Sequence, residues 1–365
     1  MNSEKSIIGF IGAGGIARSH AFALSSLPFY YNDFPAAEKE SVCSFSEESR
    51  RHFAVRFGFN RSQSLAEFAK NERINSVYVL GPNRVHFEHL KIALEMPSVT
   101  RVYLEKPVCS TADEESMILE LAAKHHDKKI QVGFQYLFCP AVKGAIDLVK
   151  SGRLGKPVHF DFKYYHGDYL RQIYRSKRAT RLTPAPDGGA MADLGSHVVS
   201  MLIAFLGDGI EITGAIQAGS FPDVPAGSDL FSLINLYDTV TGAAGTLSSS
   251  RISSGAGDFI SFEIYAEKGT VKYSTLAPDS FEYFLEETGL WNCRFSGSDY
   301  QPHTSFPSGH VPAGWLRPMI HAHYIFLTGA TPDSFAPDIS HGLSVQRIVR
   351  QTADHLERFR RYQGF

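Results

Sequence analysis

Lys106 stands where a lysine can take part in chemistry, because it directly follows an apolar segment, Val102–Leu104, that we predict to be a strand. Ligands of a parallel sheet bind at the carboxyl ends of its strands. There an ammonium group can donate hydrogen bonds to a substrate oxygen, and its charge lowers the pKa of that oxygen. A lone lysine is more often an ordinary surface residue, but its place between Glu105 and Pro107 favours a role at a site.

Asp193 and His197 form a second group, in the segment Gly188–His197. Residues four apart lie on one face of a helix, so a helix beginning here would present both side chains together. Such a pair could ligate a metal ion, but no third ligand is evident nearby in the sequence, and we expect no metal. The alternative is structural: Asp193 would cap the helix and His197 would pack in the core.

A glycine-rich turn follows the first apolar segment and fits the pattern G-x-G-x-x-A with Gly12, Gly14 and Ala17. The first glycine permits a tight turn, the second lets the backbone approach a pyrophosphate, and the alanine lets helix and strand pack closely. Gly15 and Ile16 begin a helix whose N-terminus offers free N–H donors. The pattern predicts a dinucleotide site, with a βα turn that binds nothing as the alternative. The lack of G-K-[ST] excludes a Walker-type triphosphate loop.

The end of the second predicted strand bears on which dinucleotide binds. An acidic residue there would bind the ribose 2′-hydroxyl of NAD, but Ser44 stands at the expected position. A serine with a nearby guanidinium, Arg50 or Arg51, could hold a 2′-phosphate instead. We therefore favour NADP(H) slightly over NAD(H). The opposite interpretation, with both arginines on a solvated helix face, has nearly equal weight because Glu47 and Glu48 are close.

The elements that must position these groups alternate between strand and helix in the first half of the chain. This alternation predicts a parallel sheet covered by helices. The predicted strands are Ser6–Ile11, Glu40–Phe45, Ser76–Leu80, Thr100–Leu104 and Lys129–Gly133. The predicted helices are Ile16–Ser26, Ser46–Phe57, Val85–Leu94 and Ala112–His125.

In the second half the pattern changes to period-2 alternation, typical of an antiparallel sheet with one open face. The predicted strands are Val158–Tyr165, Ile212–Ala218, Leu230–Tyr237, Ala243–Arg251, Phe259–Tyr265, Gly269–Tyr273 and Phe281–Leu285. The predicted helices are Pro140–Ser151, Gly195–Leu206, Pro318–Leu327 and Leu343–Arg360. The change of period near Gly133–Pro140 predicts one domain at residues 1–135 and a second at 136–365, with the C-terminal helix packing back on the first.

Composition excludes several other classes of protein. The 36 Lys and Arg residues nearly balance the 38 Asp and Glu residues, so a formal net charge of −2 excludes a globally basic nucleic-acid binder. The 4 cysteines form no CxxC pair and no zinc-finger spacing, so neither a disulfide framework nor structural zinc is expected. No run of about 18 apolar residues occurs, and the N-terminus lacks the features of a signal peptide. We expect a cytoplasmic protein without a membrane segment.

Together the motifs resemble one family. The glycine-rich turn, Gly81–His86, Glu105-Lys106-Pro107, Gly188–His197 and Phe262–Thr270 occur in this order and look like the glucose–fructose oxidoreductase / inositol dehydrogenase (Gfo/Idh/MocA) family. The resemblance implies an α/β Rossmann domain that binds NAD(P), then an α+β domain built on a large, mostly antiparallel sheet. It implies a homo-oligomer, a dimer or tetramer, assembled through that sheet. The implied reaction moves a hydride between nicotinamide C4 and a secondary alcohol or ketone of a sugar, cyclitol or related polyol.

The resemblance also implies roles for individual residues. At the matching motif positions, Lys106 would be the catalytic lysine, Asp193 would bind and orient the substrate, and His197 would be the acid/base. A cis peptide is expected before Pro107. Further contacts to the cofactor are expected from Pro82, Asn83, His86, Glu105 and Lys106.

Substrate contacts are expected from aromatic and polar residues after the last strand of the first domain. Aromatic walls with a few polar groups suit the apolar faces and hydroxyls of a carbohydrate. The candidates are Gln135, Tyr136, Tyr164, His166 and Arg171, with core or surface packing as the alternative for most of them. A basic run from Arg171 to Arg181 could recognise an acidic or phosphorylated substrate, although such a run more often marks a solvated loop.

Other functions fit part of the same pattern. Some members of the family use tightly held NAD to cleave glycosides by transient oxidation, so a redox-neutral hydrolase is the first rival. A non-catalytic NAD(P)-binding sensor is the second, and it would tolerate changes at Lys106 and His197. A methyltransferase shares the glycine-rich loop but would leave that pair unexplained.

Overall fold

The structure is a computed structural model that describes residues 5–34, 37–182, 188–219, 221–225, 227–297, 299–304, 306, 314–329 and 336–362, the side chains of residues 180 and 357–362 excepted. The chain divides into two compact units. The first consists of Met1–Phe138 and Tyr300–Gly342, and the second of Cys139–Asp299 and Leu343–Phe365.

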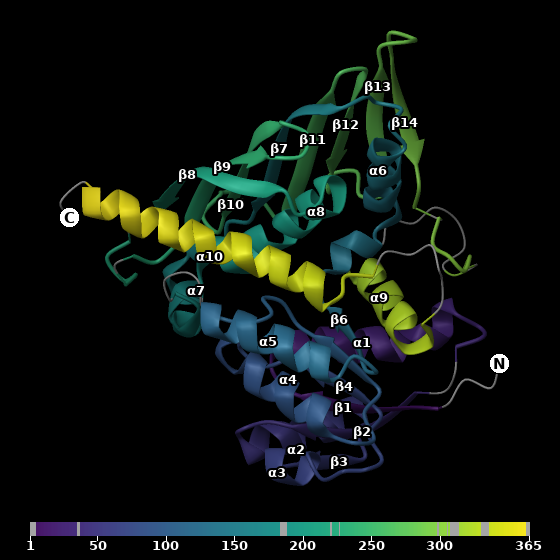
Figure 1. The fold of residues 1–365 in the computed structure, drawn as a ribbon. Helices are drawn as coiled ribbons and strands as arrows, with labels where there is room; N and C mark the ends of the chain where they lie inside the picture. Colours follow the sequence, from purple (N-terminus) through teal and green to yellow (C-terminus); the bar gives the residue numbers. More distant parts are fainter. Residues whose placement is uncertain are drawn as a thin grey trace. The chain divides into compact units, whose positions relative to one another are not determined.

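The described residues of the first unit form a six-stranded parallel sheet. Its strands are β1 (Ser6–Ile11), β2 (Ala37–Cys43), β3 (Arg61–Gln63), β4 (Ser76–Val79), β5 (Arg101–Leu104) and β6 (Lys129–Val132). Their order is β3-β2-β1-β4-β5-β6, and every neighbouring pair is parallel (Figure 1). This is the strand order of a Rossmann fold, which binds ligands where the order reverses, between β1 and β4. The predicted α/β class is confirmed.

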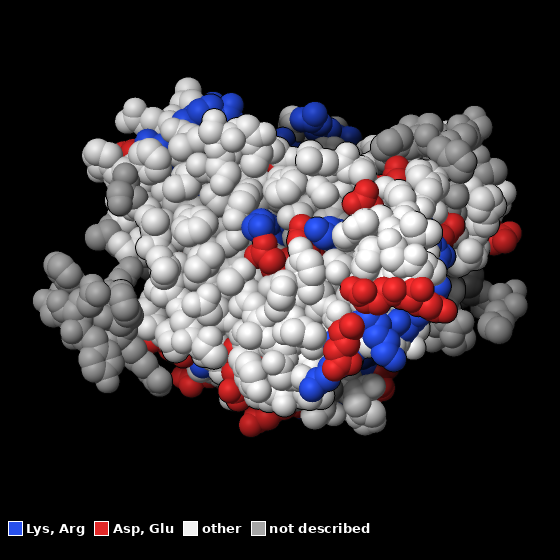
Figure 2. All heavy atoms as spheres, turned by 90° about the horizontal axis from the view of Figure 1, so that it is seen from above, with Lys and Arg blue, Asp and Glu red and all other residues white. Residues whose placement is uncertain are grey.

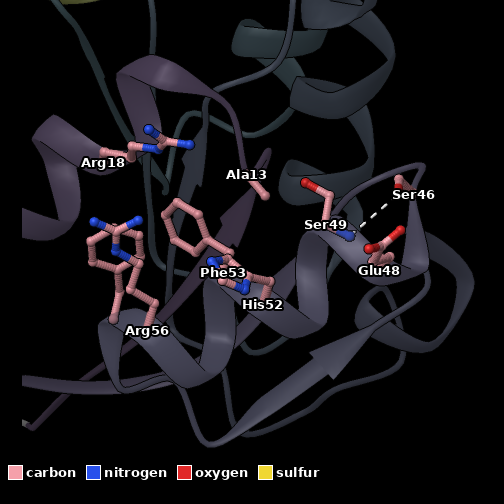
Figure 3. Close-up of a pocket in the computed structure, with 9 residues that line it drawn as sticks. Ala13, Arg18, Ser46, Glu48, Ser49, His52, Phe53 and Arg56 are labelled. Carbon is pink, nitrogen blue, oxygen red and sulfur yellow. Dashed lines mark hydrogen bonds between the residues drawn. The ribbon is translucent and has the colours of Figure 1, made fainter.

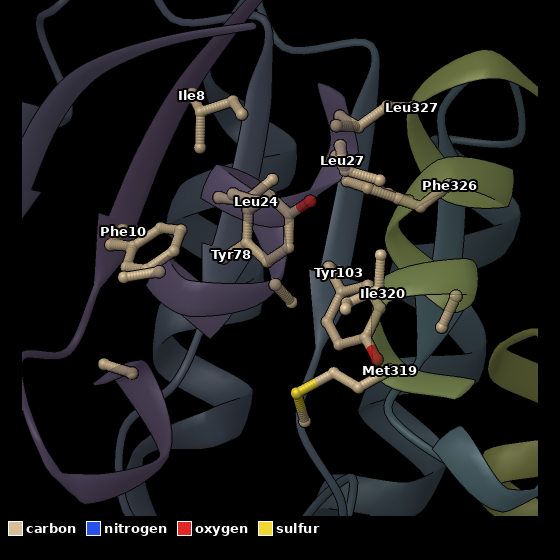
Figure 4. Close-up of a cluster of buried hydrophobic side chains, with 14 of the residues drawn as sticks. Ile8, Phe10, Leu24, Leu27, Tyr78, Tyr103, Met319, Ile320, Phe326 and Leu327 are labelled. Carbon is tan, nitrogen blue, oxygen red and sulfur yellow. The ribbon is translucent and has the colours of Figure 1, made fainter. Parts of the chain in front are cut away.

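A helix from late in the chain completes the core of this unit. The helices are α1 (Gly15–Tyr30), α2 (Glu47–Phe57), α3 (Leu65–Phe68), α4 (His86–Glu95), α5 (Ala112–Lys124) and α9 (Leu316–Thr328). In the core, Leu24 of α1 and Phe326 of α9 pack with two tyrosines of the sheet (Figure 4). The ring of Phe326 lies edge-on to Tyr78 and Tyr103, at centroid distances of 5.2 and 5.5 Å. These contacts anchor β4 and β5, whose carboxyl ends carry site residues.

Local sequence explains where several helices begin. Ser46 caps α2 by accepting a hydrogen bond from the N–H of Ser49. Thr111 and Glu114 form a capping box at the start of α5. Helix α1 differs, because its N-cap residue is Gly14, which has no side chain to accept such a bond. The first N–H groups of α1 therefore have no side-chain cap.

The described part of the second unit contains an eight-stranded sheet. Its strands are β7 (Pro157–Tyr165), β8 (Ile210–Ala218), β9 (Phe231–Asp238), β10 (Ala244–Ser250), β11 (Phe259–Ala266), β12 (Gly269–Ser274), β13 (Ser280–Leu285) and β14 (Leu290–Phe295). The order is β14-β13-β12-β11-β7-β10-β9-β8. Strands β7 and β10 are parallel, and the other neighbouring pairs are antiparallel. The predicted mostly antiparallel sheet is confirmed.

One face of this sheet is packed and the other is open. Phe162 and Phe262 are fully buried on the inner face, where their rings contact Phe205. Phe205 belongs to α8 (Ser196–Leu206), and α6 (Pro140–Lys150) packs against β12 and β13. The unit also contains α7 (Gln172–Lys177) and most of α10 (Ile339–Tyr362). In the view of Figure 2, uncharged residues cover much of the face, with charged side chains near its middle and toward its right and lower edges.

Each unit consists of two separate segments of the chain, whereas the change of sequence period near Gly133–Pro140 predicts one continuous segment per domain. The first segment ends at Phe138, close to the predicted boundary after residue 135, but residues 300–342 belong to the first unit and not to the second. The physical reason is that α9 is buried on all sides from Arg317 to Leu327, so its apolar sequence predicts a buried helix but not which sheet the helix covers. Among the described helices, none combines the length and the apolar character needed to cross a membrane.

Candidate active site

Gly12 lets the chain turn tightly beside the end of β4. Its φ is +129°, and its N–H donates to the carbonyl of Cys43 at 2.9 Å. A Cβ at this position would lie 2.7 Å from the carbonyl carbon and oxygen of Leu80, so the turn requires glycine. Ala17, in the first turn of α1, is fully buried, as close packing of helix on sheet requires.

Gly14 and Gly15 leave open space at the N-terminus of α1. A Cβ added at either position would meet no atom within 4 Å, and the helix has no side-chain cap. The exposed N–H groups and the partial positive charge of the helix end suit an anion. Ile16 packs against the core and fixes the start of the helix. These features fit the pyrophosphate of a dinucleotide, which the backbone of residues 12–16 would hold.

A cavity of about 290 Å³ adjoins this turn. Arg18 and Arg56 lie on one side of it, and Ser46, Ser49 and Glu48 lie on the other (Figure 3). Neither arginine forms an ion pair with another described residue. Two guanidinium groups therefore line a cavity next to the predicted pyrophosphate site.

Ser44 and Arg50 lie together at the end of β2, and both form local hydrogen bonds. The hydroxyl of Ser44 donates to the carbonyl of Ser46 at 3.1 Å, and Nη1 of Arg50 donates to the carbonyl of Ser44 at 3.4 Å. Neither side chain lines the cavity. The sequence pattern points to this strand end but not to the two arginines that line the cavity, because they come from different helices.

His86 connects the ends of β4 and β5. Its buried ring lies with Nδ1 2.6 Å from the carbonyl oxygen of Pro107 and Nε2 2.8 Å from that of Gly81. Burial lowers the pKa of His86, and the two carbonyl contacts oppose this only in part. The ring thus joins two loops. Pro82 is exposed and Asn83 half-buried, so these two are more accessible to a ligand than His86.

Glu105 and Lys106 follow the last residue of β5. The N–H of Glu105 donates to the carbonyl of Val79, and its carboxylate points into the unit, with Oε1 2.9 Å from Nε2 of His20. Lys106 is half-buried, and its N–H donates to Oε2 of Glu105 at 3.2 Å. The Lys106–Pro107 peptide is cis, as the resemblance implies. Lys106 therefore lies at the carboxyl edge of the sheet.

In the second unit, Asp193 lies inside a π-helical turn (Met191–Gly195) that continues into α8. The residue before α8 is Gly195, so the alternative in which Asp193 caps the helix is wrong. The Asp193 carboxylate accepts a hydrogen bond from Nη2 of Arg251 at 2.8 Å and lies 3.6 Å from Nη1 of Arg181. Arg251 is almost fully buried, so this ion pair fixes the carboxylate.

His197 lies one turn further along, on α8, and is buried. Its ring centroid is 5.9 Å from that of Tyr164, whose hydroxyl donates to Oδ1 of Asp258 at 3.2 Å. His166, after the end of β7, is buried as well. Burial lowers the pKa of His166, and the charge of Asp193 acts in the opposite direction. The second unit therefore brings together predicted substrate and catalytic residues.

The other substrate candidates have different surroundings. Gln135 and Tyr136 belong to the first unit, where both are buried in a 3-10 turn (Gln135–Phe138). Arg171 is exposed and pairs with Asp168. Within the described ranges, no group of three or more His, Cys, Asp or Glu side chains could hold a metal ion.

Two arginines of the basic run form ion pairs with carboxylates of the second unit. Arg175 is buried and donates to both carboxylate oxygens of Asp223, at 2.8 and 2.7 Å, while its guanidinium lies 4.3 Å from the ring centroid of Phe221. Arg181 faces Asp193. These contacts occupy Arg175 and Arg181, while Lys177 and Arg178 have no carboxylate partner among the described residues.

Comparison with known proteins identifies related chains. The Gfo/Idh/MocA model described as an oxidoreductase family with an NAD-binding Rossmann fold matches residues 7–134, and the C-terminal domain model of the same family matches residues 142–272. Levoglucosan dehydrogenase of Pseudarthrobacter phenanthrenivorans is 23% identical, and the match covers 93% of each chain. Glucose-6-phosphate 3-dehydrogenase of Bacillus subtilis is 26% identical over 75% of this chain and 76% of that protein.

Solved structures share the fold. Levoglucosan dehydrogenase in complex with NADH and levoglucosan has a TM-score of 0.84 at 21% identity, covering 96% of this chain and 97% of that one. An inositol dehydrogenase homologue of Azotobacter vinelandii, with NADH and myo-inositol, has a TM-score of 0.80 at 18% identity, covering 98% and 96%.

The family models match both units, in the order in which the motifs occur, and together they span more than half of the chain. The strand order of the first sheet and the open turn at α1 agree with the NAD-binding fold that the first model describes. The expected enzyme class, an NAD(P)-dependent oxidoreductase, is confirmed, and the chain belongs to the Gfo/Idh/MocA family.

Proposed function

We propose that this enzyme moves a hydride between a nicotinamide cofactor and a secondary alcohol or ketone of a sugar, cyclitol or related polyol. The observation that carries the proposal is the open N-terminus of α1 at Gly14 and Gly15, in a chain of an oxidoreductase family. The substrate class is supported by relatives that are named dehydrogenases of levoglucosan, glucose 6-phosphate and inositol.

Three side chains would act on the substrate, while the bound nicotinamide supplies the hydride acceptor or donor. In oxidation, His197 accepts the hydroxyl proton, since imidazole exchanges protons near neutral pH. Lys106 donates a hydrogen bond to the same oxygen and stabilises its developing negative charge. Asp193, held by Arg251, accepts a hydrogen bond from a neighbouring hydroxyl and orients the ring. In reduction, His197 returns the proton.

Among the substrate candidates, Tyr164 and His166 lie beside proposed catalytic residues of the second unit. Tyr164 packs beside His197, and the imidazole of His166 interacts electrostatically with Asp193. We propose that residues 136–365 supply most of the substrate contacts, with Tyr164 and His166 foremost.

Turnover with a panel of sugars and polyols tests this function. We expect net reduction of the nicotinamide, and we expect Lys106→Met and His197→Asn each to lower kcat by about 100-fold or more. Cofactor affinity should be retained in His197→Asn. Lys124→Met, a change of an exposed lysine at the end of α5, should alter neither kcat nor cofactor affinity. Cleavage of a glycoside without net NAD(P)H change would identify a redox-neutral hydrolase. Full biological function in both variants would identify a sensor.

We further propose that NADP(H) is preferred, with its 2′-phosphate held by Arg18 and Arg56. The proposal rests on the two guanidinium groups that line the cavity and have no carboxylate partner among the described residues. Guanidinium groups bind phosphate through paired, charge-assisted hydrogen bonds. Glu48, on the other side of the cavity, is the one lining carboxylate and acts against this preference.

Titration with NADPH and NADH tests the cofactor preference. We expect tighter binding of NADPH, and we expect Arg56→Gln to weaken NADPH by about tenfold because one charge-assisted contact is lost. NADH binding should not change. The matched control is Arg51→Gln, since Arg51 is exposed on the same helix, pairs with Glu47 and lies outside the cavity. Tighter binding of NADH by the unchanged protein would contradict the proposal.

We also propose that the enzyme assembles into a dimer or tetramer through the outer face of the sheet in its second unit. Ile216 of β8 is 59% exposed and is paired in register with Leu233 of β9. Aliphatic side chains on an open sheet face favour burial against another copy of that face.

A further inference from the structure

A line of buried hydrogen bonds runs through the first unit and ends beside Lys106. Oε1 of Glu105 lies 2.9 Å from Nε2 of His20, and Nδ1 of His20 lies 3.0 Å from Nε2 of His323. Nδ1 of His323 lies 3.0 Å from the hydroxyl of Tyr78. Both histidines and the tyrosine are 0% exposed. Helices α1 and α9, strand β4 and the end of β5 thus each contribute one polar group to the same line.

The surrounding structure makes room for the Glu105 carboxylate. A Cβ at position 133 would lie 2.6 Å from Oε1, so Gly133 leaves the space that this oxygen occupies. The other carboxylate oxygen accepts a hydrogen bond from the N–H of Lys106 at 3.2 Å. One oxygen therefore ends the buried line, and the other holds the main chain of Lys106.

The hydrogen bonds of this line are all donated in one direction, from Tyr78 toward Glu105. Within the described part of the chain, the hydroxyl of Tyr78 has His323 as its hydrogen-bond partner, so it donates to Nδ1 of that ring. A buried O–H donor without an acceptor would be costly. His323 must then donate from Nε2 to His20, and His20 donates from Nε2 to Glu105. In this arrangement every donor has an acceptor, and both imidazoles are neutral.

The reverse direction is less favourable. It would require His323 to donate from Nδ1 to the oxygen of Tyr78, whose own proton would then lack an acceptor among the described residues. It would also require a proton on Nδ1 of His20, which places a charge in a fully buried ring unless Glu105 is protonated. Burial lowers the pKa of His323, and the neighbouring His20 lowers it further, so this ring is neutral as well.

We propose that His20, His323 and Tyr78 are positioning residues for Lys106: they hold the Glu105 carboxylate in one orientation and, through it, the main chain from which the lysine extends. The inference rests on the proposed role of Lys106 in the reaction. None of the three touches the reacting atoms. Their effect is on where the ammonium group lies, and a displacement of about 1 Å at such a group can cost about 100-fold in rate.

Nitrogen NMR of the histidine rings tests the direction of the line and needs neither substrate nor cofactor. We expect His20 and His323 to be neutral, each with its proton on Nε2 and an unprotonated Nδ1 that accepts a hydrogen bond. A proton on Nδ1 of either ring, or a doubly protonated His20, would overturn the arrangement.

Tyr78→Phe tests the positioning effect, and Tyr103→Phe is its matched control. The two rings stack with centroids 5.2 Å apart, but the buried hydroxyl of Tyr103 has no partner among the described residues. We expect Tyr78→Phe to accelerate hydrogen exchange at the Lys106 amide and to lower kcat by about tenfold, with KM for the cofactor unchanged. Tyr103→Phe should change none of these quantities.

Two outcomes would overturn the positioning role. One is an equal effect of the two substitutions, and the other is faster exchange at Lys106 with an unchanged kcat. If the unchanged protein shows no dehydrogenase activity, the proposed function fails, while the ring protons and the Lys106 amide still report whether the line holds the main chain.

Discussion

At the scale of single residues, the sequence identifies Asp193 as a candidate site residue but does not predict its ion-pair partner. Its place in Gly188–His197 marks it as a candidate, but its partner Arg251 stands 58 positions away, at the end of β10. The period-2 pattern there predicts a strand that ends in an arginine and nothing about which carboxylate the arginine reaches. The pairing depends on the tertiary fold, as does the packing of the Arg251 guanidinium 4.6 Å from the ring centroid of Tyr169.

Arg251→Met should lower both stability and activity. It removes the hydrogen bond from Arg251 to the Asp193 carboxylate, and breaking a buried ion pair in this way typically costs about 3 kcal/mol of the free energy of unfolding. Urea unfolding and kcat/KM would measure the two effects. Arg181→Gln is the control, because Arg181 is half-exposed and lies 3.6 Å from the same carboxylate, so its loss should cost less than about 1 kcal/mol. Equal costs for the two variants would contradict the assignment.

At the scale of elements, the sequence predicts long periodic segments well and short or exposed ones poorly. Strand β1 has the predicted bounds, Ser6–Ile11. Strand β3 has 3 residues, too few for a period, and β14 is largely exposed, so it shows no apolar alternation. Helix α1 extends to Tyr30 beyond the predicted Ser26, with Pro28 inside its last turns. Tertiary packing against α9 supports this end of the helix, which local propensity does not favour.

The turn before α1 allows a sharp test by two substitutions to alanine. Gly12→Ala introduces a Cβ 2.7 Å from the Leu80 carbonyl at a φ of +129°, so we expect a loss of about 1–3 kcal/mol in the free energy of unfolding. Gly15→Ala places a methyl group in open space at the first position of the helix, where alanine is the better helix former, so stability should be unchanged or higher. Thermal unfolding without nucleotide compares them, and a stable Gly12→Ala variant would refute the account of the turn.

At the scale of the whole molecule, the change from alternating strands and helices to period-2 strands correctly predicts two kinds of sheet. The motifs locate Lys106 at the end of β5 and the glycine-rich turn at α1 for the same reason, since both follow directly on apolar strands. The return of residues 300–342 to the first unit has no local signature. The sequence therefore predicts the order of the longer elements and leaves open which unit the later ones join.

Self-association is the prediction that belongs to this scale. Ile216→Glu places a charge on the open face of the second sheet, and we expect it to reduce the mass in solution from that of a dimer or tetramer to that of the 40.4 kDa chain. Val240→Glu is the control, because Val240 is 75% exposed in the turn after β9 and not on the sheet face. Light scattering gives the masses, and a monomeric mass for the unchanged protein would reject the proposed assembly.

The discontinuity of the first unit also has a consequence for how the chain is made. Its core needs α9, which brings Ile320 and Phe326 against the sheet and His323 into the line that ends at Glu105. A ribosome synthesises residues 316–328 only after the whole sheet of the second unit. The first unit is therefore translated first, but its core is completed only when α9 has been made. A nascent chain that stops before α9 has its glycine-rich turn on an incomplete core.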